Sequence, residues 1–315
     1  MVRERNPSRL FSKVTIVGVG LMGGSLGLAI KKRGLAKEVV GLVRRRQTLV
    51  RAKALGAIDA GTLSLPQAVR GAELVIVATP VNQLGNMLRD LAPHLPAGCL
   101  VTDVGSTKVR FLRDVEKMFY VPDLVTKTVP VKPTFTFVSS HPMAGSEKEG
   151  VEHARKDLYE SSHCLLIRTK YTPADAIARL ETFWRSVGCR LVSVVTPEEH
   201  DHWVAAVSHL PHALAACLVN VVQDLAQHDP RLVTAAGPGF RDTTRVAAGA
   251  PALWTEILLS NREEVCGMIQ LLRQQLSRME TALQSNEPRR LSAQLEQASS
   301  FRQELEKKRR VRKVH

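Results

Sequence analysis

Along the first part of the chain, short apolar runs alternate with longer segments of mixed character. From about residue 12 to residue 196, the runs are rich in valine, isoleucine and leucine, and the segments between them repeat apolar residues every three or four positions. This alternation is typical of strand–helix–strand units that build a parallel sheet. The predicted strands are residues 14–17, 39–43, 74–78, 100–102, 137–139, 164–167 and 190–194.

After Thr196-Pro197 the strand pattern stops. Residues 200–227 and 252–284 carry apolar residues at helical spacing, and Gly237-Pro238-Gly239 lies between them. We therefore predict an α/β protein, with a Rossmann-type, doubly wound parallel sheet over residues 12–196, an all-helical domain over residues 197–284, and a basic tail over residues 285–315. The helices carry more apolar residues than one small bundle can cover, so we expect them to form a homodimer.

Composition is consistent with a folded protein of the reducing cytoplasm. A chain of 315 residues, 44% of them hydrophobic, can bury a substantial core. Its five cysteines are scattered and form no Cys-x-x-Cys pair, which favours free thiols. The charged N-terminus is not followed by an apolar stretch long enough for an export signal. No run approaches the roughly 20 apolar residues of a membrane span. We expect a cytoplasmic location without a membrane part.

The net charge of +14 indicates an anionic partner of some kind. Part of the excess lies in the tail. We interpret that tail as a solvated, frayed end and do not expect nucleic acid as a partner. The tail cations are Lys307, Lys308, Arg309, Arg310, Arg312 and Lys313. The remaining excess suits a small anionic substrate and an anionic cofactor.

A glycine-rich segment follows the first predicted strand and opens the first helix. It reads Gly18-Val-Gly20-Leu21-Met22-Gly23. The first glycine permits a tight turn, the second lets the backbone approach a pyrophosphate, and the third allows close packing of helix on strand. The helix N-terminus then faces the phosphate charge. The segment predicts a dinucleotide site.

The residues after the second strand bear on which dinucleotide binds. An NAD enzyme usually places an acidic residue there for the ribose 2′-hydroxyl, but this chain has Arg44 and Arg45. Arginines can pair with a 2′-phosphate, so NADP is favoured and NAD is possible; the alternative is that both are ordinary surface charges. Thr79 and Pro80 follow another strand and should line the same crevice.

Four further segments carry residues suited to chemistry. They are Asp103-Val-Gly-Ser106-Thr-Lys108, His141-Pro-Met-Ala-Gly-Ser146-Glu147, Ser208-His209-Leu-Pro-His212 and Gly239-Phe-Arg241-Asp-Thr-Thr-Arg245. From the residues alone, His141 is catalytic or structural, and Ser106 is functional or a helix cap. One of the two histidines three apart can be a hydrogen-bonded core residue. The two arginines four apart form an anion site or a solvated basic face.

In this order and spacing, the segments resemble the prephenate and arogenate dehydrogenase family over residues 13–280. The resemblance implies that His141 accepts a hydrogen bond from the substrate's ring hydroxyl and that Ser106 orients this histidine. It also implies a substrate pocket in which Arg245 holds a carboxylate. The other substrate-binding candidates are His209, His212, Arg241, Ser146 and Glu147, the last two at the pocket mouth.

The family resemblance implies oxidation and decarboxylation of a small dianionic substrate on the route to tyrosine. A base that takes the hydroxyl proton lowers the barrier to hydride loss, and a histidine suits that at neutral pH. Arginines fix the two carboxylates, and no metal is required. The product is 4-hydroxyphenylpyruvate from prephenate or, as the alternative, tyrosine directly from arogenate.

Two rival interpretations remain open. β-Hydroxyacid dehydrogenases share the glycine fingerprint and a helical second domain, but they use a lysine in that domain, and residues 213–232 contain none. A non-catalytic NADP sensor or nucleic-acid-binding protein would account for the charge, but not for Ser106, His141, His212 and Arg245 together. The 31 residues after Gln284 (315 minus 284) are too few for a chorismate mutase or a regulatory domain of the kind some family members carry.

Overall fold

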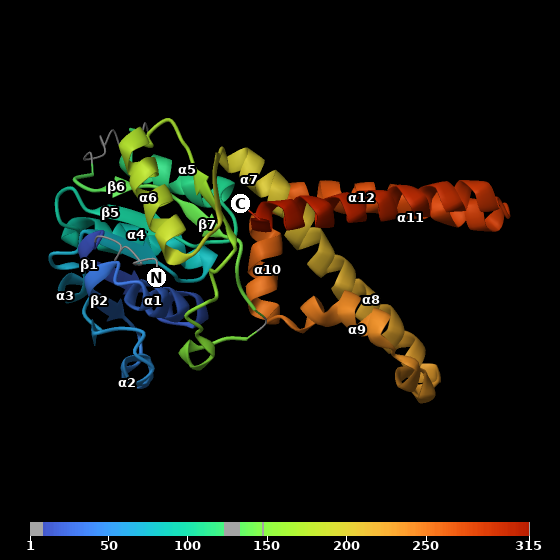
Figure 1. Cartoon of the computed structure of the whole chain (residues 1–315), viewed down its shortest axis with the longest axis horizontal. Helices are drawn as coiled ribbons and strands as arrows, with labels where there is room; N and C mark the ends of the chain where they lie inside the picture. The colour runs from blue at the N-terminus through green and yellow to red at the C-terminus, as the bar shows by residue number, and fades with distance from the viewer. Residues whose placement is uncertain (1–8, 123–132, 147, 315) are drawn as a thin grey trace. The chain divides into compact units, whose positions relative to one another are not determined.

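The central feature of the computed structural model is a six-stranded parallel sheet with strand order β3-β2-β1-β4-β5-β6 (Figure 1). The structure describes residues 9–122, 133–146 and 148–314, with side chains as far as residue 308. The strands are β1 (Phe11–Val17), β2 (Ala36–Leu42), β3 (Ala60–Thr62), β4 (Leu74–Val77), β5 (Leu100–Asp103) and β6 (Thr136–Phe137). In register, Val14 of β1 lies between Val39 of β2 and Leu74 of β4.

Helices cover both faces of this sheet, which confirms the predicted doubly wound α/β class. The helices are α1 (Leu21–Lys32), α2 (Arg46–Ala54), α3 (Leu65–Val69), α4 (Val81–Leu91), α5 (Val109–Phe119) and α6 (Ala174–Val187). One buried cluster joins β1 residues such as Ile16 to Leu26 of α1 and Trp184 of α6. A second joins Val75 and other strand residues to α4 and α5. All four β4 residues are buried because the strand is packed from both sides.

The last predicted strands lie in a second sheet, which corrects the expectation of one parallel sheet through residue 194. This sheet has the order β7-β8-β9, with β7 (Ser140–Pro142), β8 (His163–Ile167) and β9 (Leu191–Val195). β7 runs antiparallel to β8, whereas β8 and β9 are parallel. Periodicity identifies strands but not their partners, so the change of sheet after β6 had no sequence signal. The short β3 was missed because Ala-Gly-Thr contains no apolar run.

The two long helices predicted after residue 196 are each interrupted. The first consists of α7 (Pro197–Val204), a π-helical turn (Ala205–His209) and α8 (Leu210–His228). It starts earlier than predicted because Thr196 and Glu199 form a capping box with Pro197 in the first turn. The second divides at Asn261 into α10 (Pro251–Ser260) and α11 (Arg262–Gln284), while α9 (Pro238–Thr244) follows the glycine- and proline-rich connection.

One stretch, Pro197–His228, is long and apolar enough to cross a membrane when judged by length and composition alone. The expectation that no run approaches that length was therefore wrong. Residues 204–222 contain no Asp, Glu, Lys or Arg. The histidines and the serine among them interrupt the apolar run, so the stretch is not recognised as a continuous apolar segment. Taken alone, one such helix is a weak indicator of a membrane protein, and this one carries several polar residues of the site described below.

Contacts divide the chain into two compact units, residues 1–262 and 263–315. The second unit consists of α11 and α12 (Pro288–Val314). The basic tail, expected to be frayed, is helical in its backbone. Ion pairs one turn apart, Arg302–Glu306 and Lys308–Glu304, stabilise such a helix from its own surface.

Candidate active site

The glycine segment forms a cradle at the carboxyl ends of β1 and β4. Gly18 has φ +92°, and a Cβ there would lie 2.6 Å from the carbonyl oxygen of Ala78. A Cβ on Gly23 would lie 2.1 Å from the carbonyl oxygen of Gly18, so both positions exclude other residues. Gly20, by contrast, faces open space. It is the N-cap residue of α1, and it has no side chain that could accept a hydrogen bond from the first N–H groups of this helix. The N–H groups of α1 are thus available to an anion, as phosphate binding requires.

The surroundings of this cradle also fit a dinucleotide. Oγ1 of Thr79 is buried without a hydrogen-bond partner in the described part of the chain, and its Cγ2 lies beside Gly18. Pro80 is the N-cap residue of α4, while Leu21 is buried and Met22 is half-buried in α1. An orphaned hydroxyl and a free helix N-terminus are groups that a bound phosphate and ribose would satisfy.

Arg44 and Arg45 lie just past the end of β2, where a ribose 2′-substituent is expected. Both side chains are exposed. The guanidinium of Arg44 donates a hydrogen bond to the side chain of Gln83. Arg45 caps α2, and neither arginine forms an ion pair among the residues the structure describes. Their position therefore permits the role suggested by the sequence.

The loop from β5 to α5 is held by a buried ion pair. Nζ of Lys108 lies 2.5 Å from Oδ2 of Asp103, and both side chains are at most 1% exposed. Lys108 also donates to the carbonyl oxygen of Ser140, which adjoins His141. Asp103 accepts further hydrogen bonds from the N–H of Gly105 and the hydroxyl of Ser139. The pair therefore fixes both the loop that carries Ser106 and the strand that carries His141.

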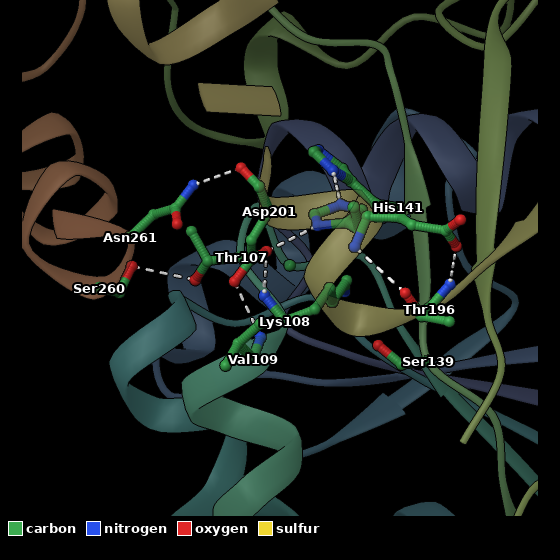
Figure 2. A network of polar contacts seen from close by, with 12 residues as sticks. Thr107, Lys108, Val109, Ser139, His141, Thr196, Asp201, Ser260 and Asn261 are labelled. Carbon is green, nitrogen blue, oxygen red and sulfur yellow. Dashed lines mark hydrogen bonds and ion pairs between the residues drawn. The ribbon is translucent and has the colours of Figure 1, made fainter. Parts of the chain in front are cut away.

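His141 belongs to a chain of three side chains shown in Figure 2. Its Nδ1 lies 2.8 Å from Nε2 of His200, and Nδ1 of His200 lies 2.7 Å from Oδ1 of Asp201. Asp201 in turn accepts hydrogen bonds of 2.8 Å from the backbone N–H groups of Lys108 and Val109, at the start of α5. His141 is half-buried, whereas His200 and Asp201 are almost fully buried. The site therefore joins β7, α7 and the N-terminus of α5.

The environment keeps these histidines neutral. Burial, with contributions from His200 and Lys108, holds the pKa of His141 well below 6.5. Burial beside Lys108 lowers the pKa of His200 to about 2. Burial raises the pKa of Asp201, while the backbone N–H groups of Val109 and Lys108 oppose that rise. At neutral pH, His141 is thus able to accept a proton or a hydrogen bond.

His209 and His212 lie close together around Trp254 of α10. The rings of His212 and Trp254 stack at 3.5 Å with an angle of 8°. His209 is buried, with Nδ1 3.2 Å from Nδ2 of Asn261, and burial lowers its pKa to about 4. Nδ1 of His212 is buried without a hydrogen-bond partner in the described chain. His209 is thus hydrogen-bonded in the core. His212 stacks its ring on Trp254, and its Nδ1 has no hydrogen-bond partner in the described chain.

The remaining predicted site residues are Ser106, Arg241, Arg245, Ser146 and Glu147. Among the described residues, no hydrogen bond joins Ser106 to His141, whose Nδ1 contacts His200 instead. Arg241 in α9 and Arg245 just after it are exposed, and Ser146 is exposed with its hydroxyl accepting from the N–H of Lys148. Glu147, predicted at the pocket mouth, lies outside the described residues.

Sequence reasoning missed several residues of this site. Lys108 was noted only as part of a motif, and His200, Asp201, Asn261 and Trp254 were not considered. A His-Asp pair directly after a capping box was the one local signal that could have indicated α7 as a source of site residues. In the described part of the chain, no group of three or more His, Cys, Asp or Glu side chains is arranged to hold a metal ion.

Comparison with known families agrees with this geometry. A model of the prephenate dehydrogenase nucleotide-binding domain matches residues 26–193, and a model of the prephenate dehydrogenase dimerization domain matches residues 196–297. The chain belongs to the prephenate dehydrogenase family. The resemblance inferred from the four sequence segments is therefore confirmed.

Individual relatives of the prephenate dehydrogenase family match most of the chain. Prephenate dehydrogenase of Bacillus subtilis (strain 168) is 33% identical over 293 residues, which is 93% of this chain and 76% of that protein. The crystal structure of prephenate dehydrogenase from A. aeolicus, with hydroxyphenyl propionate and NAD+, has a TM-score of 0.82 and 31% identity, and covers 93% of this chain and 98% of that one.

A third relative carries a different substrate name. Synechocystis arogenate dehydrogenase has a TM-score of 0.75 and 27% identity, and covers 93% of this chain and 99% of that one. These matches support the predicted enzyme class over the two rivals, so the chain is a dehydrogenase of the prephenate dehydrogenase family that binds a nicotinamide dinucleotide.

Proposed function

We propose that this enzyme oxidises and decarboxylates prephenate to 4-hydroxyphenylpyruvate, a step of tyrosine biosynthesis. The observation that carries the proposal is the neutral His141, tied through Nδ1 to His200 and leaving Nε2 without a hydrogen bond in the described chain. A neutral imidazole with one free nitrogen is suited to receive a proton from a substrate hydroxyl. Membership of the prephenate dehydrogenase family supports this choice of substrate.

In this proposal, each site residue has a defined task. A nicotinamide dinucleotide held in the cradle of Gly18, Gly20 and Gly23 would supply the acceptor for the hydride of the hydroxyl-bearing carbon. His141 takes the hydroxyl proton as that carbon loses its hydride. Loss of carbon dioxide then leaves its bonding electrons to aromatise the ring, and the proton returns from His141 to the resulting phenolate oxygen. We assign Ser106 to orient this hydroxyl or the histidine. We assign Arg245 to a substrate carboxylate through charge-assisted hydrogen bonds.

The other predicted substrate residues complete the proposed pocket. The ring of His212, stacked on Trp254, provides a flat surface beside which an aromatising ring fits. His209 supports that surface from the core. We propose that Arg241 lines the pocket, where a second carboxylate needs a cationic neighbour, and that Ser146 lies at the pocket mouth.

Arogenate is the second candidate substrate. It differs from prephenate in carrying an amino acid side chain in place of the keto acid, and it would be converted directly to tyrosine. The similarity to Synechocystis arogenate dehydrogenase supports this alternative. Either substrate presents the same ring hydroxyl to His141, so the geometry of that residue serves both.

Steady-state kinetics with both substrates and both dinucleotides tests the proposed function. We expect turnover of prephenate with a kcat/KM above that for arogenate, measured from the appearance of the reduced nicotinamide. Turnover of arogenate alone would replace the first candidate with the second. No turnover of either substrate, by a protein that binds a dinucleotide, would contradict the proposal.

Arg44 and Arg45 are proposed to select NADP, and their replacement tests this. Arg44→Ala/Arg45→Ala should raise the KM for NADP by roughly 10- to 100-fold, because hydrogen bonds to a charged group contribute about 1.5–3 kcal/mol. The KM for NAD, which lacks the 2′-phosphate, should change little. Arg46→Ala is the matched control, since Arg46 is the next residue and is also exposed. Unchanged use of NADP by the double variant would leave NAD as the proposed cofactor.

The exposed apolar surface of the helices supports a proposed assembly, and the free cysteines support a proposed location. We propose a homodimer built on the helical region from residue 197 onward, where the family model is a dimerization domain. Exposed apolar side chains on α8 and α11, such as Val221, Leu225 and Leu276, would be covered there. All five cysteines are free, as expected of a protein that works in the cytoplasm.

A further inference from the structure

The hydrogen-bond chain from His141 to Asp201 determines which ring nitrogen of His141 carries its proton. We infer that His200 and Asp201 are positioning residues that hold His141 in the tautomer with hydrogen on Nδ1, so that the lone pair on Nε2 faces the reacting hydroxyl. The inference rests on the proposed function for the identity of that hydroxyl.

The backbone groups that contact the Asp201 carboxylate can only donate hydrogen bonds. The backbone N–H groups of Lys108 and Val109 lie 2.8 Å from Oδ1 and Oδ2 of Asp201, so both oxygens act as acceptors. These two N–H groups belong to the start of α5, where the helix dipole favours a negative charge. The backbone carbonyl of Asp201 is held separately, by the side-chain amide of Asn261 (Figure 2). The two N–H groups therefore stabilise the carboxylate form of Asp201 and oppose the rise in its pKa that burial causes.

The tautomers of both imidazoles follow from that acceptor. Nδ1 of His200, 2.7 Å from Oδ1 of Asp201, must donate. A neutral imidazole has only one N–H, so Nε2 of His200 carries a lone pair. Nδ1 of His141 lies 2.8 Å from that lone pair and must donate to it. The one hydrogen of His141 is then on Nδ1, and Nε2 is free to act as the base.

The geometry also explains why a second histidine, and not a carboxylate, contacts His141. A carboxylate beside the ring would stabilise the protonated imidazolium and raise its pKa. A neutral imidazole offers the same acceptor without a full charge, while Lys108 and His209 lie close enough to disfavour a proton on His141. The relay thus orients the base and keeps it unprotonated, whereas a direct Asp–His pair would do only the first.

Replacing His200 separates this role from a merely structural one. His200→Phe keeps a ring of similar size but removes the acceptor for Nδ1 of His141. We expect kcat to fall roughly 10- to 100-fold, the usual cost of losing a group that orients a functional histidine, with KM for substrate and cofactor nearly unchanged. His200→Gln places an amide oxygen near the position of Nε2, and it should restore part of the lost kcat.

The tautomer itself can be read without substrate, from the ¹⁵N resonances of histidine side chains in the full-length, ligand-free enzyme. The signal of His141 is assigned by its absence in His141→Asn. We expect Nδ1 protonated and Nε2 unprotonated in the wild type and in His200→Gln, and a mixture of tautomers in His200→Phe. Glu199→Ala is the control, because it removes the capping box of α7 and should lower Tm without changing the tautomer or kcat.

The outcomes distinguish the inference from the proposed function. A wild-type spectrum with hydrogen on Nε2 of His141, or a tautomer and kcat that His200→Phe leaves unchanged, would overturn the relay even if the enzyme turns over prephenate. Failure of every proposed substrate would overturn the function, but the tautomer measurement would still decide whether Asp201 and His200 set the proton on His141.

Discussion

His141→Asn should lower kcat by roughly 10²- to 10⁴-fold, the usual effect of removing a general base, while the affinity for the dinucleotide stays close to that of the wild type. Asparagine can still donate to Nε2 of His200 from a position near that of Nδ1, so the packing of β7 against β8 is expected to survive. Nothing in asparagine can take up the substrate proton. Stopped-flow or steady-state measurement of nicotinamide reduction, together with a dinucleotide titration, checks both parts.

The pH dependence provides an independent check of this assignment. Because burial and the neighbouring His200 and Lys108 lower the pKa of His141, its basic form is present above that lowered value and is lost only below it. The acid limb of kcat/KM in the wild type should therefore lie below pH 6.5, with a plateau through neutral pH. The limb should disappear in His141→Asn. An acid limb centred at or above pH 6.5, or an Asn variant with normal turnover, would remove His141 from the role of base.

Lys108→Met should destabilise the protein by about 3–5 kcal/mol, the cost of leaving one member of a buried ion pair without its partner. Methionine fills a similar volume but cannot neutralise Asp103, whose carboxylate is almost wholly excluded from water. It also cannot donate to the carbonyl oxygen of Ser140. The expected result is a lower midpoint of urea denaturation and a lower Tm, accompanied by reduced kcat because the loop with Ser106 and the strand with His141 lose their common anchor.

A lysine on the surface provides the matched control for this effect. Lys170 pairs with Glu116 at 2.6 Å, but its side chain is 68% exposed. Solvent screens such a pair, so Lys170→Met should shift neither the midpoint nor kcat measurably. If Lys108→Met unfolds no more easily than Lys170→Met, the buried pair does not stabilise the fold. A double variant, Lys108→Met with Asp103→Asn, should recover part of the lost stability because it removes the unpaired charge.

Much of the fold could be predicted from sequence because its signals are local. The apolar runs that became β1, β2, β4 and β5 are buried on both sides, and this produces a pattern that can be recognised without knowing any partner. The glycines at 18 and 23 are similarly informative, because a Cβ at either position would collide with a backbone carbonyl oxygen, whereas Gly20 faces open space. The ordered motifs around Ser106, His141, His212 and Arg245 were sufficient to identify the family.

The tertiary structure determined the contacts between residues that are far apart in the chain, which local sequence signals do not contain. Residues 141 and 200 are distant in the chain and carry no shared periodicity, and their contact depends on β7 leaving the main sheet to pair with β8. Burial of Lys108 likewise depends on Asp103, Ser139 and Ser140 converging from different elements. The sequence by itself therefore determined the α/β class, the dinucleotide cradle and the histidine that is the candidate base. Only the three-dimensional packing determined the proton arrangement of that histidine, because tautomers and pKa values depend on neighbours brought together through space.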